Sequence, residues 1–339
     1  MVSVIIPTYN NSVVFLKCLN AILDSTYKNF EVIVVDDCST ENIIINNIAG
    51  INMIRLEKRS GPAAARNIGA QRATGDILFF IDSDVLIPAD TIKKVNDFFS
   101  NHTDIPAVFG SYDDTPSEIN FFSQYRNLFH HFHHQISNTM ASTFWSGCGA
   151  IRKDVFFEAG GFNQSRYKTP SIEDIDLGYR IINKGYNIEL KKDLLVKHMK
   201  RWDFLSILRT DIFQRAVPWS VLILETQSMP RDLNLKISHR ISSFLVLCIA
   251  VLLPLCFILK DLSFAELSIG KYLSLIVLIS IIVVISLNLS LYTFFYRKRG
   301  LFFALAAIPL HFLYYFYSGA AFGICAILYK TGLKSVQND

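Results

Sequence analysis

The sequence is poor in charge and has no paired cysteines. Charged residues make up 18% of the chain, and the net charge of +4 makes no case for a nucleic-acid partner, which would need a clustered basic face. The six cysteines are scattered, with no CxxC pair, which argues against a disulfide framework or a zinc site. MVSVIIPTYN lacks the basic region and long apolar core of a signal peptide, so we expect a reduced, cytosolic catalytic part.

Hydrophobic residues make up 51% of the chain, and the excess follows residue 240 or so. Apolar stretches at about 241–259, 272–296 and 301–329 each reach the roughly 20 residues that a membrane-crossing helix needs. The basic linker 226–240 and the Arg297–Arg299 cluster favour the cytoplasm, and loop 260–271 favours the outside. We therefore expect an integral protein of a prokaryotic inner or plasma membrane, with a cytoplasmic catalytic domain, three spans and a short outer tail, 331–339.

Two polar residues, Asn288 and His311, fall inside these apolar stretches. Polar side chains within spans either line a ligand site or bond between helices, and we expect helix-to-helix hydrogen bonds here.

The first 110 residues alternate between two patterns. Short apolar runs at 2–6, 30–35, 53–56 and 77–81 predict strands, and segments 13–24, 62–74 and 91–100 have helical spacing. This alternation indicates βαβ units around a parallel sheet covered on both faces. Ligands bind beyond the carboxyl ends of such strands, where PTYN, DDCST and DSD stand.

Segment 202–224 mixes Trp and Phe with large aliphatic and charged residues. It predicts an amphipathic helix at a membrane surface, bent at Pro218, with an ordinary core helix as the alternative. We take it as the end of a catalytic domain spanning 1–225.

Asp82 and Asp84 stand one residue apart, directly after the apolar run 77–81. Asp and Ser favour turns, so a capped turn is one explanation. A divalent metal site is the other, because hard cations prefer carboxylate oxygens.

Five segments in order, VSVIIPTYN, EVIVVDDCST, GPAAARNIGA, FFIDSD and SIEDIDLGYR, resemble the family 2 glycosyltransferases over roughly residues 2–220. The resemblance implies an α/β fold of the GT-A class, a Rossmann-like nucleotide-binding mixed sheet flanked by helices, here followed by a transmembrane helical region. It also implies transfer of a sugar from a nucleotide-sugar with inversion of the anomeric carbon, usually with Mg²⁺ or Mn²⁺.

The same resemblance implies the metal and catalytic residues. Asp82 and Asp84 match the family's DxD motif, with Asp84 the direct metal ligand and Asp82 also on the nucleotide side. His198 is a candidate third ligand, with a surface histidine as the alternative. Asp174 matches the catalytic base, and Glu173 its acceptor-contacting neighbour; a plain acidic helix start is the alternative for both.

The nucleotide site implied by the resemblance lies at strand ends. Asp36 and Asp37 would recognise the base and ribose, with Asp37 the better match for the base. The remaining candidates are Pro7, Thr8, Tyr9 and Arg66. Tyr9 is either a stacking residue or a surface turn aromatic, and Arg66 either contacts the nucleotide or DxD carboxylates or forms an ordinary salt bridge.

Candidate sugar or acceptor residues follow. SGCGAIR resembles the family's glycine-containing loop and supplies Gly147, Cys148 and Gly149. Gln214, Arg215 and Trp219 are similar to the QxxRW motif of polysaccharide synthases, but with a different spacing. The histidines between His130 and His134 have metal-ligand spacing, yet nearby Arg126 and Asn127 favour a solvated or acceptor-facing helix.

We therefore predict a metal-dependent inverting glycosyltransferase that moves a sugar from a UDP- or GDP-sugar to a membrane lipid or lipid-linked glycan. The alternatives are a processive polysaccharide synthase and a non-catalytic membrane scaffold; a glycosidase ranks far below. The predicted partners are the donor, the lipid-linked acceptor and the membrane, with a possible homo-oligomer and no nucleic acid.

Overall fold

A computed structural model describes residues 1–339 except 42, 44–49, 231, 233–234, 265–266 and 333–339. The chain forms two compact units, Met1–Asp203 and Phe204–Asp339. The helix predicted near 202–224 belongs to the second unit. Most of the predicted tail, and part of the predicted linker, lie outside the described residues.

The first unit is built on an eight-stranded sheet of order β3-β2-β1-β4-β7-β6-β8-β5. Its strands are β1 (Val2–Thr8), β2 (Phe30–Asp36), β3 (Ile51–Arg55), β4 (Ile77–Ile81), β5 (Val85–Leu86), β6 (Ala107–Tyr112), β7 (Cys148–Arg152) and β8 (Ile188–His198). Strands β3, β2, β1 and β4 are parallel, as the sequence predicts. Strand β7 is antiparallel to both of its neighbours, so the sheet is mixed.

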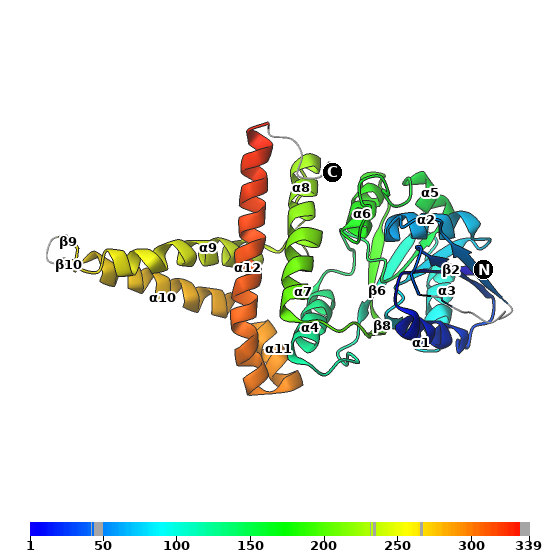
Figure 1. The fold of residues 1–339 in the computed structure, drawn as a ribbon, viewed down its shortest axis with the longest axis horizontal. Helices are drawn as coiled ribbons and strands as arrows, with labels where there is room; N and C mark the ends of the chain where they lie inside the picture. Colours follow the sequence, from blue (N-terminus) through cyan, green and yellow to red (C-terminus); the bar gives the residue numbers. More distant parts are fainter. Residues whose placement is uncertain (42, 44–49, 231, 233–234, 265–266, 333–339) are drawn as a thin grey trace. The chain divides into compact units, whose positions relative to one another are not determined.

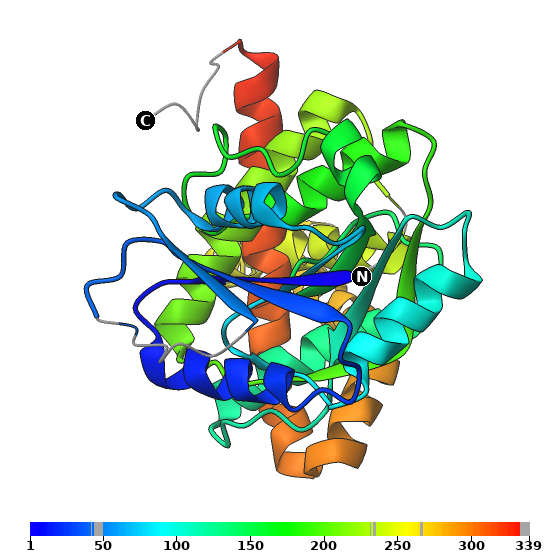
Figure 2. The same ribbon diagram turned by 90° about the vertical axis from the view of Figure 1, so that its right-hand side faces the viewer.

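Helices cover both faces of this sheet. They are α1 (Ser12–Leu23), α2 (Pro62–Arg72), α3 (Thr91–Asn101), α4 (Phe121–Ile136), α5 (Lys153–Glu158) and α6 (Glu173–Asn183). Figure 2 shows α1 and α2 on opposite faces of the parallel strands. Side chains alternate along a strand, so Val4 and Ile6 pack with α1 while Ile5 contacts α2 at Gly69. Both faces are therefore buried, which explains the unbroken apolar runs.

The second unit begins with one continuous helical segment made of α7 (Phe204–Arg209), η1 (Thr210–Ala216) and α8 (Val217–Thr226). The middle part is a π-helix that ends just before Pro218. Proline cannot donate a backbone hydrogen bond, and π-turns are a known way for a helix to accommodate an interrupted ladder. A helix therefore forms where the sequence predicts one, with the irregularity on the amino-terminal side of Pro218.

Three helices of this unit are long and apolar enough to cross a membrane: α9 (Ile237–Ile258), α10 (Ile269–Leu287) and α12 (Leu301–Lys330). The short strands β9 (Ser263–Phe264) and β10 (Leu267–Ser268) join α9 to α10. The predicted continuous helix 272–296 is wrong, because the chain breaks at Asn288 and continues as α11 (Leu289–Arg299).

The predicted polar contacts between these helices are confirmed. Asn288 donates to Ser242 Oγ at 3.0 Å and accepts from the Tyr315 hydroxyl at 2.7 Å, and Tyr292 pairs with His311 at 3.0 Å. These bonds satisfy buried polar groups in an apolar bundle. Asn288, at the break between α10 and α11, is bonded to both α9 and α12.

Candidate active site

The parallel register of β1, β2 and β4 brings three polar strand ends to one edge of the sheet. Thr8 pairs with Asp36 across β1 and β2, and β4 ends at Ile81, one residue before Asp82. The backbone N–H of Asp37 donates to the Thr8 carbonyl at 2.9 Å, which locks the first two ends together. The predicted convergence at the carboxyl ends is confirmed.

Asp36 and Asp37 differ in their surroundings. Asp36 is fully buried; it accepts from the Ser39 backbone at 3.0 Å and faces Arg55 at 3.5 Å, so it holds the turn after β2. Asp37 accepts from the backbone N–H groups of Ser60 and Gly61, at 2.6 and 2.9 Å. Carboxylate oxygens carry further lone pairs, so Asp37 remains able to accept from a base.

A glycine is required where this loop meets α2. Gly61 has φ +85°, and a Cβ added to it would lie 2.3 Å from the Lys168 carbonyl oxygen. Only glycine fits such a backbone angle and approach without strain.

Tyr9 and Pro7 border the same edge. Pro7 is the penultimate residue of β1, and the Tyr9 ring carries the Arg59 guanidinium 4.3 Å from its centroid. A ring that already holds a cation on one face offers its other face for stacking.

The DSD segment is joined to His198 by strand pairing. Val85 of β5 pairs antiparallel with His198 of β8, and the Met199 N–H donates to the Asp84 carbonyl at 2.8 Å. His198 Nε2 consequently lies 3.7 Å from Asp84 Oδ2. Burial raises the pKa of Asp84, but the hydrogen bond and charge of His198 outweigh burial and leave that pKa below its usual value.

Arg66 connects this segment to the ED motif. Its guanidinium donates to Asp82 at 2.7 Å and to Glu173 at 2.8 Å, and it is buried against the Phe162 ring at 5.5 Å. Burial and the charge of Asp84 raise the pKa of Asp82, although the Arg66 charge opposes this. Arg66 therefore forms an ion pair with one DxD carboxylate, that of Asp82, and its contact with a nucleotide stays a prediction.

The ED motif begins α6, where carboxylates are favoured by the helix dipole. Both carboxylate oxygens of Glu173 already accept hydrogen bonds, one from Arg66 and the other from the Ser171 N–H at 2.9 Å. Asp174 is half-buried and accepts from the Ser146 N–H at 3.2 Å. Burial and the charge of Glu173 raise the pKa of Asp174 to about 6. Of the two, Asp174 is the carboxylate suited to exchanging a proton.

The SGCG loop lies between these two motifs. The Gly147 carbonyl accepts from the Asp82 N–H at 3.3 Å, and Gly149 lies against the Trp145 carbonyl so closely that a Cβ would be 2.3 Å from it. Cys148 is fully buried in the core, which raises the pKa of its thiol, so this residue offers only its backbone to a ligand.

An aromatic group near His198 was missed by sequence reasoning. Tyr112 stacks on His198 at 4.1 Å between ring centroids, and Trp145 lies edge-on to Tyr112 at 4.8 Å. Nothing local in the sequence marks these residues, because long-range strand pairing brings them together.

The histidine cluster of α4 is not solvated, so that alternative is wrong, while an acceptor-facing role stays a prediction. His131, His133 and His134 are buried, and so is Asn127. His131 Nδ1 lies 2.7 Å from the Tyr112 carbonyl oxygen and His134 Nδ1 lies 3.2 Å from that of Gly110. These histidines hold α4 against β6.

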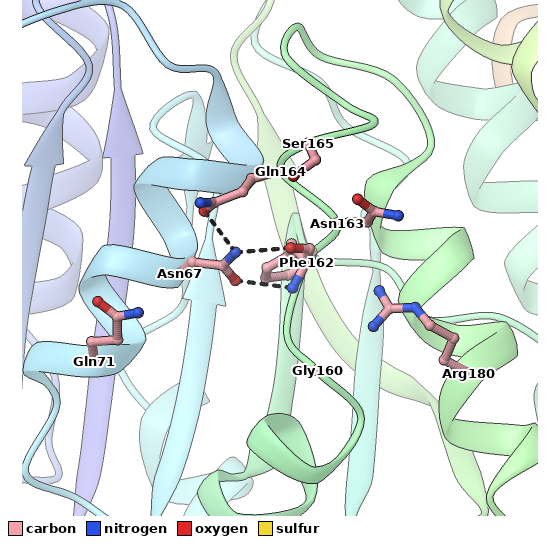
Figure 3. Close-up of a pocket in the computed structure, with 8 residues that line it drawn as sticks. All are labelled: Asn67, Gln71, Gly160, Phe162, Asn163, Gln164, Ser165 and Arg180. Carbon is pink, nitrogen blue, oxygen red and sulfur yellow. Dashed lines mark hydrogen bonds between the residues drawn. The ribbon is translucent and has the colours of Figure 1, made fainter. Parts of the chain in front are cut away.

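A second unpredicted residue, Asn67, follows Arg66 on α2. Its amide exchanges hydrogen bonds with the Phe162 backbone, at 2.8 Å to the carbonyl and 2.9 Å from the N–H, and it donates to Gln164 at 3.0 Å (Figure 3). The surrounding pocket has a volume of about 400 Å³ and includes Gln71 and Arg180. Asn67 thus ties the loop that leads into the ED motif to the helix that carries Arg66.

The charge balance of this edge favours a cation. The carboxylates of Asp82, Asp84, Glu173 and Asp174 outnumber the cationic side chains that act on them, which are Arg66 and, at Asp84, His198 and Lys200. Among the described residues, no group of three or more His, Cys, Asp and Glu side chains is already gathered in a ligating arrangement. The Asp84–His198 pair nevertheless supplies the oxygen and nitrogen donors that suit Mn²⁺, so the residues fit such an ion.

Gln214, Arg215 and Trp219 belong to the second unit, on η1 and α8. Their assignment to an acceptor region stays a prediction.

Residues 3–159 match the model of the family described as glycosyl transferase family 2. The chain contains a family 2 glycosyltransferase domain. An uncharacterized glycosyltransferase of Haemophilus influenzae is 27% identical over 54% of this chain and 63% of its own length. The Staphylococcus aureus poly(ribitol-phosphate) beta-N-acetylglucosaminyltransferase TarS is 35% identical over 30% of this chain and 19% of its own length. The chain thus spans less than two thirds of these curated relatives.

Solved structures agree on the fold. Residues 1–349 of S. aureus TarS, in complex with UDP-GlcNAc, align with 100% of this chain and 93% of that one, at 16% identity and TM-score 0.51. The mannosyltransferase PcManGT of Pyrobaculum calidifontis, in complex with GDP-Man and Mn²⁺, aligns with 98% of this chain and 88% of that one, at 16% identity and TM-score 0.50. The GT-A fold is therefore confirmed.

Proposed function

We propose that this protein is a membrane-associated, metal-dependent inverting glycosyltransferase that uses a UDP- or GDP-sugar. The observation that carries the proposal is the guanidinium of Arg66, which bridges the DSD segment to the ED motif at 2.7 and 2.8 Å. A group that holds the donor's diphosphate and a group that accepts a proton thereby share one edge of the sheet. TarS with UDP-GlcNAc and PcManGT with GDP-Man and Mn²⁺ have the same fold, which supports a nucleotide-sugar donor and a divalent ion.

On the donor side, Asp84 and His198 would hold Mg²⁺ or Mn²⁺, with Asp82 beside them. The ion would neutralise charge on the nucleoside diphosphate leaving group. Asp37 would accept a hydrogen bond from the base, and the Tyr9 ring would stack on it, with Pro7 and Thr8 forming the adjoining wall. Arg66 would keep Asp82 oriented toward the donor.

On the acceptor side, Asp174 would take the proton of the attacking hydroxyl. The acceptor oxygen would then form a bond to the anomeric carbon while the bond from that carbon to the diphosphate oxygen breaks, so the configuration inverts. A base with a pKa of about 6 is largely ionised at neutral pH and still accepts a proton. Glu173, already bound to Arg66 and Ser171, would position its neighbour rather than react.

We propose a lipid or lipid-linked glycan as the acceptor, because three helices of the second unit are apolar and long enough for a membrane. A processive polysaccharide synthase is the second candidate, favoured only by the similarity of Gln214, Arg215 and Trp219 to QxxRW. The altered spacing of those residues counts against it. The bonded Arg66–Asp82–Glu173 cluster counts against a non-catalytic scaffold, because buried charges without a use are costly to keep.

Nucleotide binding and turnover test the proposal separately. Purified full-length protein in detergent is titrated with UDP- and GDP-sugars, with Mn²⁺ and with EDTA. We expect metal-dependent binding of one donor class, weakened at least about 10-fold by Asp84→Ala. Asp174→Asn should keep binding and lose transfer. Asp104→Ala, at an exposed carboxylate outside the site, is the matched control. Binding that EDTA leaves unchanged, or full turnover by Asp174→Asn, contradicts the assignment.

A further inference from the structure

The three long apolar helices of the second unit do not run in one direction. Helices α9 and α10 lie side by side as an antiparallel hairpin that ends at β9 and β10. Helix α12 runs across this pair rather than alongside it (Figure 1). A bundle of three parallel spans would look different.

Side-chain contacts place the crossing at the base of the hairpin, the end away from β9 and β10. On α9, His239 pairs with the Tyr315 hydroxyl at 2.6 Å and Ser243 donates to the Tyr315 carbonyl at 2.8 Å. Farther along, a Cβ on Gly319 would lie 2.9 Å from Leu247. From His239 to Leu247 the helix rises about 12 Å, roughly a third of the length of α9.

The second helix of the hairpin, α10, also meets α12 at the base of the hairpin. Tyr315 packs with Val284 and donates to Asn288, which follows the last residue of α10. Beyond Leu247, α9 exposes Val251 and Phe257. The middle of α12 is therefore seated across the base, and the outer part of the hairpin presents apolar side chains to its surroundings.

The hairpin has the dimensions of a bilayer. At about 1.5 Å per residue, the 22 residues of α9 and the 19 of α10 measure about 33 and 28 Å, against a hydrocarbon thickness of about 30 Å. Charged residues stand at both ends, with Arg240 at the base and Lys260 and Lys271 near the tip. Lipid-length apolar surface between two charged ends is the pattern of a pair of membrane crossings.

A helix that crosses the base of a membrane-spanning hairpin cannot cross the bilayer itself. We propose that α12 lies in the plane of the membrane, within the leaflet at the base of the hairpin. Its exposed side chains, among them Phe302, Leu305 and Ile324, then face acyl chains, and the Arg297–Arg299 cluster before it meets lipid headgroups.

A tie to the preceding helix supports this placement. The Tyr317 hydroxyl donates to Asp211 at 2.6 Å, so α12 is fastened to the π-helical segment that the chain passes through before it reaches the base of the hairpin. The chain thus crosses the membrane twice, and Lys330 stays on the side of the catalytic unit. This proposal differs from the sequence expectation of three spans with an outer tail, which stays untested.

Cysteine accessibility in intact cells tests the topology without reference to activity. Full-length variants Asp261→Cys, Lys330→Cys and Asp104→Cys are treated with a membrane-impermeant maleimide before and after lysis, with the unsubstituted chain as background. We expect Asp261→Cys to be labelled in intact cells. We expect Lys330→Cys and Asp104→Cys to be labelled only after lysis. Labelling of Lys330→Cys in intact cells means three crossings and overturns the proposal. Absence of labelling at Asp261→Cys means that the hairpin does not cross, and overturns it as well.

A fluorescent protein fused to the carboxyl terminus gives an independent reading, because it matures in the cytoplasm and not when it is exported unfolded. Fluorescent cells with membrane-bound fusion protein support two crossings. A membrane-bound fusion protein that stays dark contradicts them.

Discussion

Asp174→Asn should stabilise the fold while it stops transfer. The pKa of Asp174 is raised from 3.8 to about 6, a difference of about 2 units, which corresponds to about 3 kcal/mol at 1.36 kcal/mol per unit. Because the side chain is only half-buried, solvent screening reduces this, and we expect about 1.5 kcal/mol. For a unit of about 200 residues that corresponds to a rise of about 3–6 °C in the melting midpoint.

The sign follows from proton linkage. A carboxyl group whose folded-state pKa is raised favours the folded state at low pH, and that contribution disappears as pH rises through about 6. Asparagine is neutral at every pH, so the gain should be full at pH 8 and shrink toward pH 4.5. Melting of full-length protein in detergent with EDTA, followed by tryptophan fluorescence, measures both midpoints. Asp104→Asn is the control for an exposed carboxylate. An equal gain at both pH values, or a lower midpoint at pH 8, refutes the reasoning.

Three further changes address the supports of the site. Arg66→Met should lower the free energy of unfolding in urea by about 3–5 kcal/mol, because Glu173 stays buried without its partner. Adding Glu173→Gln should recover most of that loss, and equal stability of the single and double variants contradicts the prediction. Gly61→Ala should weaken nucleotide binding, since its Cβ would meet the Lys168 carbonyl and displace the amides that bind Asp37, and unchanged affinity contradicts it. Asn67→Leu should lower kcat at unchanged donor KM, because the loop before the ED motif loses three hydrogen bonds; an unchanged kcat contradicts it.

The parts of the site that the sequence predicts are those set by local pattern. Apolar runs followed by polar residues place Thr8, Asp37 and Asp82 at strand ends, and a parallel sheet then brings them to one edge. Helix starts are local too, so the position of Asp174 at the beginning of α6 follows from its own neighbourhood.

The parts that the sequence does not predict depend on distant pairing. β7 enters the sheet antiparallel, and β5, two residues long, has no pattern of its own. The histidines of α4 look like surface residues in the sequence. In the structure they lie in the interior, where His131 and His134 form hydrogen bonds with carbonyl groups of β6. Asn288 stands out as a polar residue in an apolar stretch, but nothing local marks the end of α10 there, and the Tyr315 hydroxyl that donates to it belongs to a distant helix.

The pairing of β5 with β8 also has a consequence for biosynthesis. Asp84 is synthesised long before His198, and only the antiparallel register of Val85 with His198 places the two side chains together. A nascent chain that has emerged as far as β7 has both carboxylates of DSD but only half of the proposed ligand pair. Ion capture at this edge would therefore be a late event in folding, and a partly made enzyme would leave the cell's nucleotide-sugars untouched.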